Sequence, residues 1–322
     1  MINFFDNLYT SINNKFRLLN KLRFYSFLRF LVRFTANIIL PIYFNLSSRN
    51  DRYRLNRCNK TSDRIIVSLT SFPVRINKIW LVIESLLRQT EKPDKIILWL
   101  SLVQFNSLQI LPQNLLKLQK RGLEIRLCEG DLRSHKKYYY AMQEFPNDKI
   151  ITVDDDVFYN SNILKHLIAL NRKYPHSVCC NHCSKIEVSN DQIQPYFMWK
   201  NYELDECLDN NIFPIGVGGI LYPPKVLSPF VFNVIDFKKY SFMADDIWLN
   251  SMMKLAGNFA VKSSFNSSYL PIINFNNITL NSENVCQGLN DKQLHAVREL
   301  LIKRYGFDIF QEILINNKRI SK

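Results

Sequence analysis

The fold of this 322-residue chain is decided by the sequence KIITVDDD at residues 149–156. After Lys149 come four residues that are mostly apolar and β-branched, as in a strand buried on both faces of a sheet. Three carboxylates follow directly. Because side chains alternate along an extended chain, Asp154 and Asp156 point to the same side and can share one ligand. The stretch therefore predicts a buried strand that delivers acidic groups to one edge of a sheet.

Three further strands are predicted before this one, at residues 65–69, 95–100 and 123–127. Between the first two, apolar residues at helical spacing predict a helix that is capped by Asn77 and ends near Gln89. Strands and helices that alternate with short connections predict an α/β fold, with a mostly parallel sheet and helices on both faces. In such sheets ligands bind at the carboxyl ends of the strands, which is where the three aspartates lie.

Three adjacent carboxylates repel one another and need a nearby cation. Carboxylate oxygens suit Mg²⁺ or Mn²⁺, usually with substrate phosphates completing the coordination shell. We therefore expect Asp154 and Asp156 to be metal ligands. The alternative interpretation is an acidic triplet in a solvated loop, or an aspartate that caps the next helix.

Two later segments carry further candidate groups. The glycines of the sequence IGVGG at residues 215–219 permit a ligand to approach the backbone closely. Asp245 and Asp246 open a predicted helix, whose dipole stabilises a carboxylate as the anion and so suits a base. The structural alternatives are a tight turn before an edge strand for the glycines, and helix capping by Asp245 for the acid pair.

The order of these motifs resembles that of nucleotide-sugar glycosyltransferases of the GT-A fold. The resemblance is carried by SLTSFP at 68–73, QT at 89–90, PDK at 93–95 and TVDDD at 152–156, and it covers roughly residues 63–300. More narrowly, the chain resembles bacterial transferases that build capsule, lipopolysaccharide or related surface glycans. The resemblance implies a Rossmann-like GT-A domain at residues 61–322, with a nucleotide-sugar-binding half at 61–157 and an acceptor-binding half, including a C-terminal helix, at 158–322.

The resemblance also implies roles for individual residues. A divalent ion on Asp154 and Asp156 would bridge the donor diphosphate, and Asp246 or Asp245 would face the acceptor hydroxyl. Metal and basic groups stabilise a departing nucleoside diphosphate. The expected donor is a UDP-sugar and the expected acceptor a glycan or a lipid-linked glycan. The candidate donor-binding residues are Thr70, Arg75, Arg133, Lys136, Lys137, Asp154, Asp155, Gly218 and Gly219.

Most of the net charge of +14 lies near the N-terminus. Residues 1–60 hold eleven Lys or Arg against two Asp. A helical stripe of Phe16, Leu19, Phe27, Phe30 and Phe34 predicts an amphipathic extension that binds an anionic membrane surface. The charge-free run at 34–48 is broken by Pro41, so we expect it to be too short and kinked to span a bilayer. A helical pair packed on the main domain, or a nucleic-acid-binding arm, is the alternative.

Without a secretory cleavage site, the expected location is cytoplasmic, on the inner face of the cell membrane.

A nucleotidyltransferase is the rival enzyme, but residues 68–76 lack the glycine-rich phosphate loop usual in that class. A polyanion- or nucleic-acid-binding protein is the rival without catalysis; the acid-lined strand end fits it poorly, so we expect no nucleic-acid partner. Cys180 and Cys183 lack a second ligand pair for zinc and are expected to be buried thiols. His295 is either a late metal ligand or a surface residue.

Overall fold

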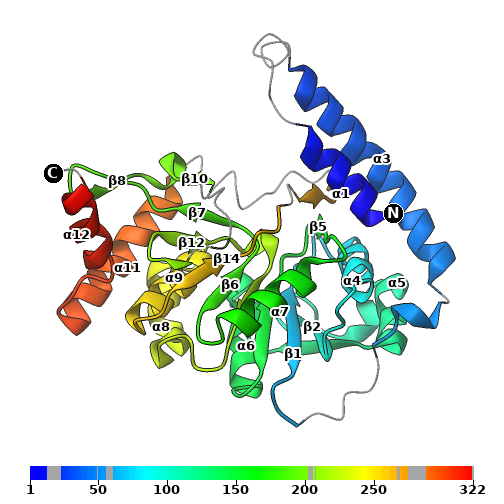
Figure 1. Cartoon of the computed structure of the whole chain (residues 1–322). Coiled ribbons are helices and arrows are strands. Elements are labelled where there is room, and N and C mark those ends of the chain that lie inside the picture. Colours follow the sequence, from blue (N-terminus) through cyan, green and yellow to red (C-terminus); the bar gives the residue numbers. More distant parts are fainter. Residues whose placement is uncertain are drawn as a thin grey trace.

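The computed structural model describes residues 1–12, 23–48, 50–55, 61–201, 206, 208–266, 269–274 and 288–320. Its centre is an eight-stranded sheet in the order β11-β14-β6-β13-β4-β1-β2-β3 (Figure 1). The strands are β1 (Ile65–Thr70), β2 (Lys95–Ser101), β3 (Leu123–Cys128), β4 (Lys149–Thr152), β6 (Val178–Cys180), β11 (Leu208–Asp209), β13 (Ile220–Tyr222) and β14 (Ala260–Lys262).

Within this sheet, β13 and β11 run antiparallel to the strands beside them, and the other neighbouring strands pair in parallel. The helices are α1 (Ile2–Ser11), α3 (Phe24–Ser47), α4 (Ile79–Leu87), α5 (Gln113–Leu116), α6 (Lys136–Glu144), α7 (Ile163–Lys173), α8 (Val234–Tyr240), α9 (Asp245–Leu255), α11 (Leu289–Tyr305) and α12 (Gln311–Ile320). The predicted mostly parallel sheet of a Rossmann-like α/β fold is confirmed.

Smaller strands complete the second half of the chain. A three-stranded sheet has the order β10-β7-β12, and two ribbons pair β15 with β5 and β8 with β9. Their bounds are β5 (Val157–Phe158), β7 (Cys183–Lys185), β8 (Val188–Ser189), β9 (Gln192–Ile193), β10 (Lys200–Asn201), β12 (Ile212–Pro214) and β15 (Leu270–Pro271). The β5–β15 ribbon matters most for the site, because β5 begins directly after the three aspartates.

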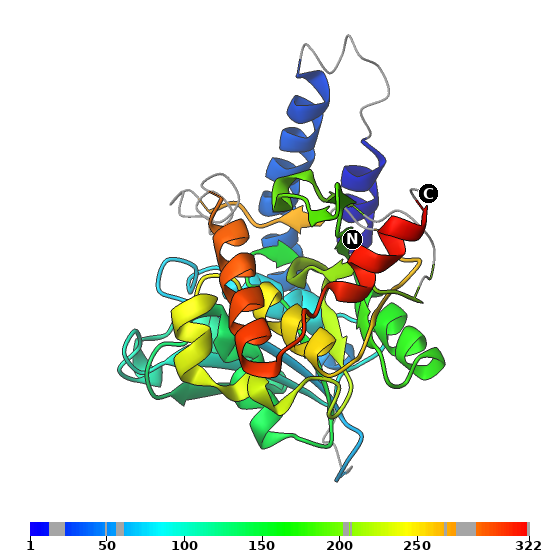
Figure 2. The ribbon, with the colours of Figure 1, turned by 90° about the vertical axis from the view of Figure 1, so that its left-hand side faces the viewer.

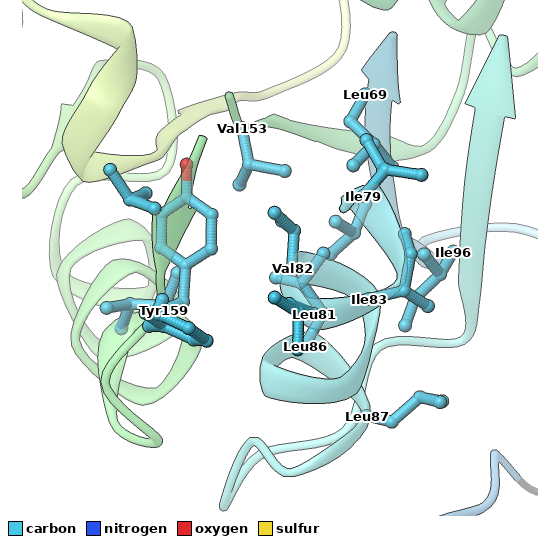
Figure 3. Close-up of a cluster of buried hydrophobic side chains, with 14 of the residues drawn as sticks. Leu69, Ile79, Leu81, Val82, Ile83, Leu86, Leu87, Ile96, Val153 and Tyr159 are labelled. Carbon is cyan, nitrogen blue, oxygen red and sulfur yellow. The ribbon is translucent and has the colours of Figure 1, made fainter. Parts of the chain in front are cut away.

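Alternate residues of the sheet face two different layers of helices. Ile66 and Ile150 pack with Ala141 of α6 on one face. On the other face, Leu69 of β1 and Val153 belong to the cluster that surrounds α4 (Figure 3). This alternation is the two-residue period of extended chain. It confirms that helices cover both faces and explains why the strands are apolar at nearly every position.

The helix after β1 starts later than expected. The predicted cap, Asn77, is wrong: α4 begins at Ile79, its N-cap is Lys78, and no side chain caps it. The preceding residues instead form successive turns, in which Ile76 N donates to Phe72 O and Lys78 N donates to Arg75 O. These turns are what hold Arg75 beside the carboxyl end of β1.

The N-terminal helices α1 and α3 pack against the main domain. Ala36, Leu40 and Phe44 of α3 have no exposed surface and, with Ile2 and Phe5 of α1, join the cluster around α4. The expectation that Pro41 would break this segment is wrong, because α3 continues through it to Ser47. Burial of the stripe on both sides of Pro41 offsets the roughly 3 kcal/mol that a proline costs inside a helix. Phe16 and Leu19 of the predicted stripe lie outside the described residues.

A buried ion cluster holds the α3 end of this packing in place. Glu84 of α4 pairs with Arg88 and, at 2.5 Å, with Arg121, and the Glu84 side chain is only 3% exposed. Arg88 also donates to Ser47 Oγ at 2.8 Å, and its guanidinium lies 4.4 Å from the centre of the Phe44 ring. One carboxylate thereby forms ion pairs with two buried guanidinium groups near the end of α3.

We expect Glu84→Ala to destabilise the protein by about 3–5 kcal/mol, because it leaves two buried arginines without their carboxylate. Chemical denaturation measures this loss. The control is Glu91→Ala, at an exposed position a short distance along the chain. Equal unfolding midpoints for the two variants would show that the cluster contributes no stability.

Candidate functional site

Strand order explains how three segments far apart in sequence meet. β13 pairs antiparallel with β4, placing Ile220 opposite Thr152. The start of β13 is thus beside the end of β4, and the glycine segment before β13 lies next to the aspartates after β4. Helix α6 ends shortly before β4 begins and packs against β4 and β1, so that its first turn, with Lys137, lies at the carboxyl end of the strands.

Lys137 joins the aspartate triplet after β4 to the acid pair of α9. Its Nζ lies 2.8 Å from Asp154 Oδ1 and 2.9 Å from Asp245 Oδ2, while only 5% of its side chain is exposed. Burial alone would lower the pKa of Lys137, but Asp154, Asp245 and Asp246 outweigh it and hold the pKa well above the ordinary value. Lys137 is therefore a permanently charged ammonium that fixes the aspartates after β4 against the start of α9.

Arg75 organises the other two aspartates of the triplet. Its Nη1 lies 2.5 Å from Asp155 Oδ1 and 3.0 Å from Asp156 Oδ2. Asp155 is buried and also accepts a hydrogen bond from Ser71 Oγ at 2.6 Å. Asp156 keeps 40% of its side chain exposed. Asp155 is thus held by protein groups, and Asp156 is the member of the triplet most open to a ligand.

Asp246 lies in a different environment from Asp245. Its Oδ2 accepts a hydrogen bond from Gly216 N–H at 3.2 Å, and its buried Oδ1 has no hydrogen-bond partner among the described residues. Desolvation, and next the charge of Asp245, raise the pKa of Asp246 to about 7, whereas Lys137 opposes the rise. A carboxylate with such a pKa can take up a proton near neutral pH.

Gly216 is the site residue that the sequence analysis missed. A Cβ at this position would lie 3.2 Å from Asp246 Oδ1, 3.2 Å from Lys137 Nζ and 3.3 Å from Asp154 Oδ1. Only glycine leaves these three charged groups room around the backbone. The run IGVGG signalled a close approach, but only the pairing of β13 with β4 shows which of its glycines faces the acids.

The neighbouring glycines, both predicted to bind the donor, lie away from the carboxylates. A Cβ on Gly218 would lie 2.7 Å from that of His182, so this glycine permits close packing of two segments. Gly219 has φ +81° and would face Leu167, Ile163 and Val153. The left-handed conformation of Gly219 turns the chain from the 3₁₀ turn at Gly216–Gly218 into β13.

Three further predicted donor-binding residues have other partners. Thr70 Oγ1 donates to Trp99 O at 2.8 Å, and buried Lys136 pairs with Asp131. The exposed Arg133 lies over the Phe242 ring at 5.2 Å. Of the predicted basic residues, Arg75 and Lys137 are the two that contact the aspartate triplet.

The proposed capping role of Asp245 is wrong. Ala244 is the N-cap of α9, and no side chain caps this helix. Asp245 is buried, which by itself would raise its pKa, but Lys137 overcomes this and lowers the pKa below the ordinary value. Asp245 therefore serves as the anionic partner of Lys137.

The charge balance of the site fits a divalent cation. Five carboxylates meet two basic side chains, Lys137 and Arg75, so the site carries excess negative charge. Among the residues that the structure describes, no three His, Cys, Asp or Glu side chains are disposed to hold a metal on their own. Asp154 and Asp156 could offer one or two carboxylate ligands to an ion that completes its shell elsewhere.

Other candidate metal ligands lie apart from these acids. His295 is 70% exposed on α11, where it pairs with Glu299 at 3.1 Å. Cys180 and Cys183 are free and buried, as predicted.

No protein-family model and no curated protein matches this chain. Solved structures with a similar fold include S. aureus TarS residues 1–349, with 17% identity and a TM-score of 0.42 over 64% of this chain. The mannosyltransferase PcManGT from Pyrobaculum calidifontis, in complex with GDP-Man and Mn²⁺, has 11% identity and a TM-score of 0.47, covering 88% of this chain and 78% of its own.

A third similar structure is 4-diphosphocytidyl-2C-methyl-D-erythritol synthase from Anaerococcus prevotii, with 14% identity and a TM-score of 0.42, covering 73% of this chain and 99% of its own. The present chain spans 59% of the length of the TarS fragment.

The environments of Asp245 and Asp246 predict opposite effects on stability. The folded-state pKa of Asp246 is raised, so ionisation of Asp246 reduces stability as pH rises from about 4 through about 7. We expect Asp246→Asn to remove this penalty and to raise Tm at pH 8, by roughly 1–2 °C for each kcal/mol recovered. The gain should shrink towards pH 4. Thermal denaturation in EDTA across this range measures it.

The matched control is Asp245→Asn. The pKa of Asp245 is lowered in the folded state, so its stabilising contribution is present above its unfolded-state pKa and is lost as pH falls. This variant should lower Tm at pH 8. A fall in Tm for both variants at pH 8 would contradict the environment assigned to Asp246.

Proposed function

We propose that this chain is a metal-dependent glycosyltransferase that moves a sugar from a nucleoside-diphosphate sugar, most simply a UDP-sugar, to a glycan or lipid-linked acceptor in surface-polysaccharide synthesis. The observation that supports it is the buried Lys137 ammonium, which joins the triplet after β4 to the acid pair of α9. Glycosyl transfer needs two functions side by side: a site for a charged leaving group and a group that accepts the proton of the acceptor hydroxyl. The aspartate triplet can supply the first and the acid pair of α9 the second.

On the donor side, Asp154 and Asp156 would hold Mn²⁺ or Mg²⁺. When bound, such an ion neutralises the diphosphate that leaves with the nucleoside. Arg75 lies 3.0 Å from Asp156, so its guanidinium can add hydrogen bonds to the same phosphates. Lys137 pairs with Asp154 and Asp245 and acts here by fixing these carboxylates.

On the acceptor side, Asp246 is the proposed base. The Gly216 amide orients one of its oxygens and leaves the other without a protein partner among the described residues. The pKa of Asp246 near 7 matches what a base needs at neutral pH: it is ionised in part and still basic enough to accept the hydroxyl proton.

This pKa also favours glycosyl transfer over the rival nucleotidyl transfer. In nucleotidyl transfer to a sugar phosphate the attacking oxygen belongs to a phosphate that is already anionic, so no base is required. A hydroxyl acceptor must lose a proton, and Asp246 is placed to act as the general base that accepts it. The two reactions release different products, a nucleoside diphosphate or pyrophosphate, so product analysis separates them.

We expect UDP or a related nucleoside diphosphate to stabilise the protein only when Mn²⁺ or Mg²⁺ is present. At a ligand concentration of 100 times Kd the gain is about 2.7 kcal/mol, which a thermal-shift assay detects. Asp156→Asn should abolish the metal-dependent part of the shift. Asp63→Asn, at a surface position that is 75% exposed, is the control. A full metal-dependent shift in Asp156→Asn would remove the metal assignment.

We expect Asp246→Asn to reduce kcat by about 10²–10⁴, as loss of a general base does. The affinity for the nucleotide in the presence of Mn²⁺, read from the thermal shift, should stay within a few-fold of that of the unmodified protein. In the unmodified protein kcat/KM should rise with pH through about 7, and this limb should vanish in the variant. If Asp245→Asn loses turnover while Asp246→Asn keeps it, the two roles are exchanged.

A further inference from the structure

Helix α3 has two halves with different surroundings. From Phe24 to Thr35 no residue is buried, whereas Ala36, Leu40 and Phe44 are fully buried further on. Both views show the N-terminal end of α3 projecting beyond the sheet and its covering helices (Figures 1 and 2). By length and composition alone, the helix is long and apolar enough to cross a membrane. Of its most apolar 18-residue stretch, 17% is buried.

The exposed apolar residues of α3 form one continuous surface. At about 100° per residue they occupy roughly half the circumference, opposite the buried stripe. We call this surface the apolar arc; it consists of Phe24, Phe27, Phe30, Leu31, Phe34, Ile38, Ile39, Ile42 and Leu46, which are 38–81% exposed. So much contiguous apolar surface is unusual on a protein that meets only water.

The basic residues of α3 lie on the other side of the helix. Arg29 and Arg33 continue the line of the buried stripe, and Arg29 Nη2 donates to Ile12 O at 2.6 Å, directly after α1. Between Phe24 and Ser47 there is no acidic residue. An apolar face on a helix that carries basic and no acidic residues is complementary to a bilayer with anionic headgroups, because the acyl chains take up the apolar face and the net positive charge attracts the headgroups.

The C-terminal half of α3 is fixed to the main domain by polar bonds. Asn37 Nδ2 donates to Pro271 O at 3.0 Å, and Asn37 Oδ1 accepts from Ile273 N at 2.9 Å. Further along, Arg88 bonds Ser47. A helix that crossed a bilayer would have to leave these partners and expose Leu40 and Phe44. The structure therefore favours a helix that lies in the membrane surface.

Helix α1 and its N-cap also carry exposed apolar side chains. The helix packs along α3, and Met1, Phe4 and Leu8 are 41–64% exposed. Its other side is bonded to the main domain, where Asn3 Nδ2 donates to Ser161 Oγ at 2.8 Å. The two helices thus form one unit on a rigid base.

We propose that the apolar arc of α3, together with the exposed side of α1, inserts into one leaflet of an anionic bilayer and anchors the protein as a monotopic membrane protein. The occupant of this surface is lipid, because the arc is broad and convex and lies on a helix that carries basic and no acidic residues. The proposal does not depend on the proposed catalytic function, since anchoring needs no nucleotide or acceptor.

The first test is sedimentation with vesicles of phosphatidylcholine and phosphatidylglycerol, without nucleotide or metal. Phe27→Ser combined with Phe34→Ser should lower the partition coefficient at least tenfold. The control is Val103→Ser combined with Ile110→Ser, which removes two exposed apolar residues outside α1 and α3 and should leave partitioning unchanged. Circular dichroism checks that both variants are folded. Equal loss in both would overturn the assignment of the surface.

The second test separates a helix in the membrane surface from one that spans. Tryptophan is introduced singly as Phe27→Trp, Phe34→Trp and Ile42→Trp, and quenching by lipids brominated at different depths is compared with that of the unmodified protein. A surface helix places all three positions at a similar shallow depth. Graded depths with a deep middle position would instead show that α3 spans and would overturn the monotopic anchor.

A second copy of this chain is the competing occupant of the arc. Light scattering in the absence of vesicles measures the oligomeric state. An oligomer that the Phe27→Ser, Phe34→Ser variant dissociates, combined with no vesicle binding by the unmodified protein, would show that the arc is a protein interface and would reject the proposal. A monomer that sediments with vesicles supports it.

Discussion

The candidate site is organised around one buried charge, the Lys137 ammonium. Placed at the first turn of α6, it meets Asp154 from the end of β4 and Asp245 from the start of α9. Without this charge the carboxylates would repel one another in a poorly solvated space, and the aspartate triplet could not lie so close to the acid pair of α9. Its charge also divides the pair of α9, because Asp245 takes the ion pair and Asp246, beside the Gly216 amide, is left with a raised pKa. Neighbouring residues of the same type thereby acquire different chemistry.

The sequence predicted the strands β1, β2 and β4 because they are buried on both faces and so are mostly apolar, and it predicted the edge strand β3 from its alternation of apolar and charged residues. The same logic placed Asp154 to Asp156 at a sheet edge and Asp245 at a helix start. Which glycine of the run faces the acids could not be predicted, since Gly216 is selected by its position across from β4, which no local pattern records. Lys137 could be placed near the acids but its two ion pairs could not, because one of them reaches more than a hundred residues along the chain.

The N-terminal extension shows a different limit. Its charge and amphipathic pattern were readable, but the continuity of α3 through Pro41 depends on tertiary burial of Ala36, Leu40 and Phe44, which overrides the local tendency of proline. Those residues share a core with α4. The division at residue 60 between an extension and a domain remains a prediction from composition, and it cuts across this shared core. Removing the extension would expose apolar surface of the domain, which is why single side chains, and not truncations, are the appropriate way to probe it.

The short segment from Leu270 to Ile273 connects helix α3 to the candidate site. Asn37 of α3 is bonded on both sides to Pro271 and Ile273, and between them Ile272 N donates to Asp156 O at 2.8 Å. The acid most open to a ligand is therefore linked to the projecting helix through three hydrogen bonds of one short segment. On a bilayer this short link would set the height of the proposed reacting centre above the lipid headgroups, and an acceptor would be selected by how far its terminal sugar reaches from its lipid as well as by its chemical identity.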